Sequence, residues 1–152
     1  MNIKAKDVLR EMEEKSREKY EGSTPLFKAL YDEDTSLVLK LLDEGADIEE
    51  RDSVGLTPLC CAARFEDVEF LKELIRRGAE IDPDFGSGKV LTPLMFACLW
   101  GRVGNVRLLV DSGADVNRID DKGYTYLWWA DQCSDMEAKK KIISILISSG
   151  AI

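Results

Sequence analysis

The sequence predicts an all-α solenoid of four helix-turn-helix units joined by hairpin-like fingers. Two markers recur in step along the 152 residues. The first is a threonine at a helix start, at Thr24, Thr57, Thr92 and Thr125. The second is a Gly-Ala pair that follows each threonine, at Gly45, Gly78, Gly113 and Gly150. The spacing of 33, 35 and 33 residues between the threonines indicates small units that bury their apolar faces by stacking on one another.

The markers set the expected boundaries of each part of the chain. The four units are predicted at about 23–55, 56–90, 91–123 and 124–152, folding as one cooperative domain. Ahead of them, residues 1–22 carry six basic and six acidic side chains, with Val8, Leu9 and Met12 on one helical face. This pattern predicts an amphipathic N-terminal helix that caps the open end of the first unit.

Each unit is expected to contain two short helices. Threonine can cap a helix N-terminus, and the proline that follows it in three units fits the first helical turn. Small residues such as Ala29 and Ala62 keep the first helix slim, and runs such as Leu37 to Leu42 give the second helix an apolar face. The glycine of the second marker supplies the left-handed residue that ends the second helix.

The last unit departs from this pattern. It has four extra residues between its helices, and Ser134 with Glu137 predicts a capping box at the start of the final helix. That helix is rich in isoleucine, and the sequence ends at Ile152. We expect the unit either to expose apolar surface or to fold Ile152 back over it.

The repeated stretches GADIEERDSVGLTPL (45–59) and GADVNRIDDKGYTYL (113–127) resemble the finger and helix start of ankyrin repeats. The resemblance covers residues 23–152 and implies the ankyrin-repeat solenoid as the fold. Ankyrin repeats usually have histidine after Thr-Pro-Leu; those places hold Phe27, Cys60, Met95 and Trp128 here. We expect these apolar side chains to lie in the core and replace the polar tie between units.

The resemblance also implies that a partner protein lies against the fingertips and the groove-facing first helices. Carried onto this sequence, it predicts as contacts Tyr31, Asp32, Arg64, Phe65, Phe85, Phe96, Leu99, Trp100, Ile119, Tyr124 and Trp129. The aromatic members are predicted to form a nearly continuous stripe, since interfaces are enriched in Tyr, Trp and Phe. Phe65, Trp100 and Tyr124 favour contact with the partner, whereas Phe96 and Trp129 fit core or contact equally.

Catalytic chemistry has no support in the sequence. The chain lacks histidine, the commonest general base at neutral pH and the commonest zinc ligand. Gly88-Lys89 resembles part of a phosphate-binding loop, but Pro83 and Val90 stand where that loop needs glycine and Ser or Thr. We therefore expect a non-catalytic protein with no cofactor and no metal.

Charge narrows the class of partner. With 21 basic and 29 acidic residues the net charge is −8, which disfavours nucleic-acid binding. Residues 32–52 hold nine acidic and two basic side chains, an arrangement that suits a partner with a basic surface or simply aids solubility. The four cysteines fit reduced core thiols, and no signal peptide or membrane-length apolar run is present. We expect a cytoplasmic protein without membrane contact.

Two functions are consistent with these features. The first is a stoichiometric binder or inhibitor of one partner protein, monomeric when unbound; a bacterial immunity protein that neutralises a basic toxin is one example. The alternative is a scaffold or adaptor that self-associates or docks through its apolar C-terminal repeat. The oligomeric state discriminates between them.

Overall fold

The computed structural model describes residues 7, 10, 23–84 and 92–152. The predicted capping helix over residues 1–22, apart from Asp7 and Arg10, and the predicted contact Phe85 lie outside these residues. The first helix of each unit is α2 (Pro25–Tyr31), α4 (Pro58–Ala62), α6 (Pro93–Leu99) or α8 (Tyr126–Asp131). The second is α3 (Thr35–Asp43), α5 (Val68–Arg76), α7 (Val103–Asp111) or α9 (Met136–Ser148).

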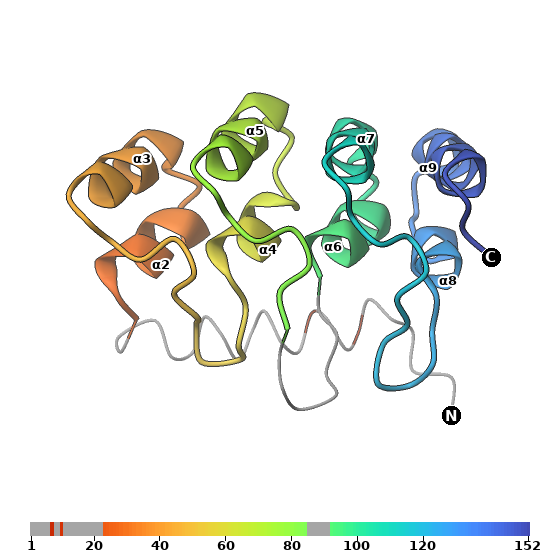
Figure 1. Cartoon of the computed structure of the whole chain (residues 1–152), viewed down its shortest axis with the longest axis horizontal. Helices are drawn as coiled ribbons and strands as arrows, with labels where there is room; N and C mark the ends of the chain where they lie inside the picture. The colour runs from red at the N-terminus through yellow and green to blue at the C-terminus, as the bar shows by residue number, and fades with distance from the viewer. Residues whose placement is uncertain (1–6, 8–9, 11–22, 85–91) are drawn as a thin grey trace.

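The helices form two layers, as the sequence predicted (Figure 1). The second helices lie side by side in one row, the first helices lie beneath them, and the fingers extend below. Neighbouring units contact each other in both layers, with α6 against α8 and α7 against α9. The all-α solenoid is therefore confirmed, and the first and last units lie at its opposite ends (Figure 1).

The predicted threonine caps are confirmed. Each marker threonine precedes a first helix and accepts a hydrogen bond from a backbone N–H in its first turn; Thr92, for example, accepts from Met95 at 3.3 Å. The second helices end at the marker glycines, where Gly78 has a φ of 93° that an L side chain rarely adopts. The repeated markers therefore start and end the helices for the physical reasons that the sequence suggests.

The start of α9 differs from the prediction. The N-cap is Asp135 and not Ser134; the Oδ1 atom of Asp135 accepts from the backbone N–H groups of Glu137 (3.0 Å) and Ala138 (3.1 Å). Aspartate caps α3 and α5 in the same way, through Asp34 and Asp67. A carboxylate satisfies the free amides and also interacts favourably with the positive end of the helix dipole.

The core replaces the expected polar tie by apolar packing. Phe27, Cys60 and Met95 are almost fully buried, so the prediction for these three positions is confirmed. All four cysteines are buried free thiols, and burial raises the pKa of Cys60 to about 11. Trp128, the fourth member of the set, is only half-buried, and its predicted place in the core is wrong.

Side chains four residues after the marker glycines hold each unit to the next. Asp82 Oδ2 accepts the backbone N–H of Asp115 at 2.8 Å. One junction later, Asn117 Oδ1 accepts from the backbone N–H of Ile152 at 3.0 Å, while its Nδ2 donates to the carbonyl of Gly150 at 3.1 Å. The amide thus makes two inter-unit hydrogen bonds where the carboxylate can only accept.

Replacing Asp82 with asparagine is expected to stabilise the chain by about 1 kcal/mol. Asp82 Oδ1 is buried without a hydrogen-bond partner among the described residues, whereas an amide Nδ2 at that position can donate to the carbonyl of Gly113, as Asn117 does one unit later. Thermal unfolding should show a midpoint about 2–4 °C higher. The reverse change, Asn117→Asp, should lower it, and a lower midpoint for Asp82→Asn would contradict the assignment.

The effect of Asp82→Asn should depend on pH. Burial raises the pKa of Asp82, and the nearby charge of Asp115 raises it further. The hydrogen bond from the Asp115 N–H and the charge of Arg118 lower it, but the net result is a raised pKa. Because the protonated carboxyl is favoured in the folded state, the wild type gains stability as the pH falls from neutral toward 3.8, the ordinary pKa of aspartate. The advantage of asparagine should therefore be greatest at neutral pH and shrink on acidification.

Two polar side chains at the start of α7 reach back to the turn that follows α4. Asn105 is buried, and its Nδ2 donates to the carbonyls of Ala63 (3.0 Å) and Phe65 (2.8 Å). Arg102, the N-cap residue, donates from Nε to the carbonyl of Arg64 and forms an ion pair with Glu66 at 2.8 Å. These donors satisfy carbonyls that a helix as short as α4 leaves free at its end, so the second and third units are joined by polar as well as apolar contacts.

Candidate functional site

The predicted aromatic stripe does not form. Phe65, Phe96, Leu99 and Trp129 are at most 6% exposed. The surface position predicted for Phe65 and Leu99 is therefore wrong, and of the two alternatives left open for Phe96 and Trp129 the structure shows the core. Phe65 packs in a stacked arrangement on Phe70, with ring centroids 5.8 Å apart. The Trp129 indole N–H donates to Asp120 Oδ2 at 3.1 Å, which satisfies its polar atom inside the protein. Large aromatic side chains at these positions fill the spaces between units.

The other described members of the predicted set lie at the surface. Trp100, Ile119, Tyr124 and Asp32 are exposed. Tyr31 and Arg64 are half-buried; the Tyr31 hydroxyl donates to Asp52 Oδ2 at 2.6 Å, and Arg64 Nε donates to a carbonyl of its own turn. These residues come from all four units, and the exposed apolar ones belong to the third and fourth.

The finger before the last unit presents an aromatic pair. Asp120 Oδ1 accepts the backbone N–H groups of Lys122 (2.9 Å) and Tyr124 (2.8 Å), which fixes the turn. The Tyr124 ring then stacks on Trp128 with centroids 3.8 Å apart and planes 10° apart. Trp128 also meets Trp129 edge-on at 5.1 Å. The stack is therefore positioned by two contacts, the buried Trp129 ring against Trp128 and the hydrogen-bonded turn at Asp120 that precedes Tyr124.

Trp128 is less buried than its equivalents in the preceding units. It stands three residues after its marker threonine, the position that Phe27, Cys60 and Met95 occupy in the preceding units. Those three side chains are at most 1% exposed, whereas Trp128 in α8 keeps part of its surface accessible.

On the final helix, too, side chains are more exposed than their equivalents in the preceding units. Seven residues before the marker glycines, Val38, Leu71 and Val106 are fully buried, but Ile143 at that position is half-buried. Ile147, three residues before its glycine, is 58% exposed.

We name Tyr124, Trp128, Ile143 and Ile147 the terminal face. It combines the last finger with α8 and α9 at the end of the solenoid (Figure 1). Ile152 does not cover this face, because its side chain is 90% exposed while its backbone N–H bonds Asn117. Of the two alternatives that the sequence left open for the last unit, the structure shows exposed apolar surface.

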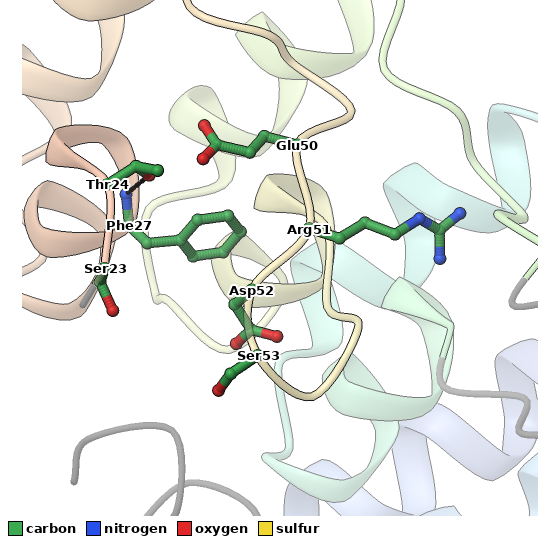
Figure 2. A pocket seen from close by; sticks show the side chains of 7 residues that line it. All are labelled: Ser23, Thr24, Phe27, Glu50, Arg51, Asp52 and Ser53. Carbon is green, nitrogen blue, oxygen red and sulfur yellow. Dashed lines mark hydrogen bonds between the residues drawn. The ribbon is translucent and has the colours of Figure 1, made fainter. Parts of the chain in front are cut away.

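A second feature lies at the other end of the solenoid, where the first finger meets the start of α2. There a hollow of about 430 Å³ is lined by Ser23, Thr24, Phe27, Glu50, Arg51, Asp52 and Ser53 (Figure 2). Figure 2 shows the Phe27 ring directed toward the finger and the Arg51 side chain directed away from the hollow. Arg51 donates to the carbonyl of Asp84 at 2.8 Å. The carboxylates of Glu50 and Asp52 therefore give the hollow an acidic character.

In the described ranges, no group of three or more His, Cys, Asp or Glu side chains is placed to hold a metal ion. No helix among residues 23–84 and 92–152 has the length and apolar character needed to cross a membrane. The chemistry that both features offer is non-covalent contact, apolar at the terminal face and electrostatic at the hollow.

Comparison with known proteins agrees with the fold. A family model of ankyrin repeats in three copies matches residues 4–85, and one for a single ankyrin repeat matches residues 91–121. The curated protein "Dauer abnormal formation protein 25" of Caenorhabditis elegans is 34% identical over 102 residues, which are 67% of this chain and 26% of that protein. The chain thus spans about a quarter of the length of this relative. Ankyrin repeats are protein–protein interaction modules and are generally non-catalytic. With its four repeats and matching family models, this chain belongs to the ankyrin-repeat family.

Proposed function

We propose that this chain is a scaffold or adaptor that docks another protein on its terminal face. The observation that supports the proposal is the comparison of repeat positions: side chains that are buried in the first three repeats are partly exposed in the fourth. Exposed apolar patches mark interaction sites in soluble proteins. Tryptophan and tyrosine, which form the stack at the edge of the terminal face, are the residues most enriched among binding hot spots.

The terminal face is pre-organised for binding. Trp128 is held between Tyr124 and Trp129, so its ring loses little freedom when a partner covers it. Ile143 and Ile147 lie one turn apart on α9 and therefore share one side of that helix. A partner with an apolar helix or loop can bury these side chains without reorganising the repeat stack.

Affinity capture with the purified chain as bait tests this function. Ile147→Asp and Trp128→Ala should each weaken retention of the partner by about 2 kcal/mol or more, roughly thirtyfold. Leu37→Asp is the matched control, because Leu37 is an exposed leucine at the opposite end of the solenoid. Thermal unfolding of each bait checks that the repeats remain folded. Equal retention by all four baits would contradict the proposal.

The acidic hollow favours a second candidate, a stoichiometric binder or inhibitor of one partner with a basic surface, such as an immunity protein that neutralises a basic toxin. The hollow lies within the strongly acidic first unit and its finger, where a lysine or arginine of the partner would meet Glu50 and Asp52. In the same capture experiment, Glu50→Lys should then release the partner, whereas Glu69→Lys on α5 should not.

A further inference from the structure

We propose that Ser134 is a phosphorylation site for a protein serine kinase that recognises acidic residues after its target serine. Ser134 belongs neither to the terminal face nor to the acidic hollow. It lies in the loop between α8 and α9, where the last unit has four extra residues. The residue is exposed, and its hydroxyl makes no hydrogen bond within the described part of the chain. The Oγ atom is therefore accessible to a phosphoryl donor.

The two acidic residues that follow Ser134 supply the recognition. Asp135 stands one position after it and Glu137 three positions after it, and both are exposed. Asp135 uses Oδ1 to cap α9, and its Oδ2 has no hydrogen bond among the described residues. Glu137 pairs with Lys140 at 3.7 Å, but its side chain is 75% exposed, so this ion pair is weak. A kinase with a cationic substrate groove can therefore contact both carboxylates.

The context of Ser134 differs from that of the other serines. The remaining exposed serines among the described residues have no acidic residue one or three positions after them; they are Ser36, Ser53, Ser144, Ser148 and Ser149. Ser112 has Asp115 three positions after it, but it is half-buried at the C-terminal end of α7 and glycine follows it. Ser112 is thus a natural control for exposure and for the first acidic position.

The chemistry is transfer of one phosphoryl group from ATP. Ser134 Oγ forms a bond to the γ-phosphorus, the bond from that phosphorus to the bridging oxygen breaks, and ADP leaves. The hydroxyl proton passes to the general base of the kinase.

The product changes the charge at the junction between the third and fourth units. Phosphoserine carries a charge of about −1.5 to −2 at neutral pH. It would stand just before α9, where the positive end of the helix dipole favours negative charge. The loop packs on the turn of the third unit, since a Cβ atom placed on Gly101 would lie 2.9 Å from Cys133 Sγ. Phosphorylation therefore makes this junction more acidic and favours a partner with a basic surface.

Incubation of the purified full chain with casein kinase II and magnesium ATP tests the site. We expect intact-mass spectrometry to show one added phosphoryl group and peptide mapping to place it on Ser134. Ser134→Ala should abolish it, and Ser112→Ala, the control, should leave it unchanged. Asp135→Asn and Glu137→Gln should each lower kcat/KM about tenfold, because each removes a charge that the kinase contacts. Asparagine can still cap α9, so Asp135→Asn separates recognition from helix stability.

Three results would overturn the inference. The first is no incorporation into the chain while a synthetic peptide of serine followed by glutamates is phosphorylated in the same reaction; the fold would then withhold Ser134. The second is incorporation at Ser112 or another residue in place of Ser134. The third is a rate at Ser134 that Asp135→Asn and Glu137→Gln together leave unchanged. Far-ultraviolet circular dichroism checks that every variant and the phosphorylated chain retain their helices.

Discussion

Asn105→Asp is expected to destabilise the folded chain by about 3–5 kcal/mol, because it places a carboxylate where the structure uses a hydrogen-bond donor. Asn105 is 1% exposed, and its Nδ2 donates to the carbonyls of Ala63 and Phe65. A carboxylate would face both carbonyl oxygens and could donate to neither unless it bound a proton. The midpoint of thermal unfolding should fall by roughly 10 °C.

Two further variants separate the contributions at this position. Asn105→Leu keeps most of the side-chain volume and introduces no charge, so it measures the loss of the two hydrogen bonds, about 2 kcal/mol. Part of this loss is offset, because the leucine also removes Asn105 Oδ1, which is buried without a hydrogen-bond partner among the described residues. Lowering the pH should partly rescue Asn105→Asp and leave Asn105→Leu unaffected. If Asn105→Asp unfolded at the wild-type temperature, the amide would not join the two units as described.

Phe65→Ala is expected to cost about 3–5 kcal/mol of folding stability, the range for removing a buried phenylalanine ring. Phe65 stacks on Phe70, and both rings are at most 4% exposed, so alanine would leave a cavity between the first and second helices of one unit. The change should appear as a lower midpoint in urea with the same slope. Phe65→Leu, which fills part of the cavity, should recover a portion of the loss.

Trp100→Ala provides the contrasting case. Both residues were predicted from the sequence as partner contacts, but Trp100 is 42% exposed and should lose far less stability when truncated. The pair therefore distinguishes core from surface at two sites that the resemblance treats alike. Similar unfolding midpoints for Phe65→Ala and Trp100→Ala would show that the Phe65 ring is not part of the core.

The sequence identified the repeat positions well and the exposure of individual side chains poorly. The resemblance placed Phe65 and Trp100 near the ends of first helices, and both are there. Their burial depends on what the neighbouring turn contributes, here the Phe70 ring against Phe65. Trp128 is the opposite case, since a position that is buried in the three preceding units is half-buried in the last one.

The sequence was sufficient to predict the all-α solenoid, its four helix pairs, the starts of the first helices and the glycines after the second helices, because threonine caps, prolines and glycines act within a few residues. It also located the acidic first unit, since charge is additive along the chain. Contacts in the folded chain decided that Asn105 bridges two units and that Phe65, Phe96 and Trp129 are core. The bridge joins residues 40 and 42 positions apart, and the burial of the rings depends on packing, neither of which spacing within one repeat specifies.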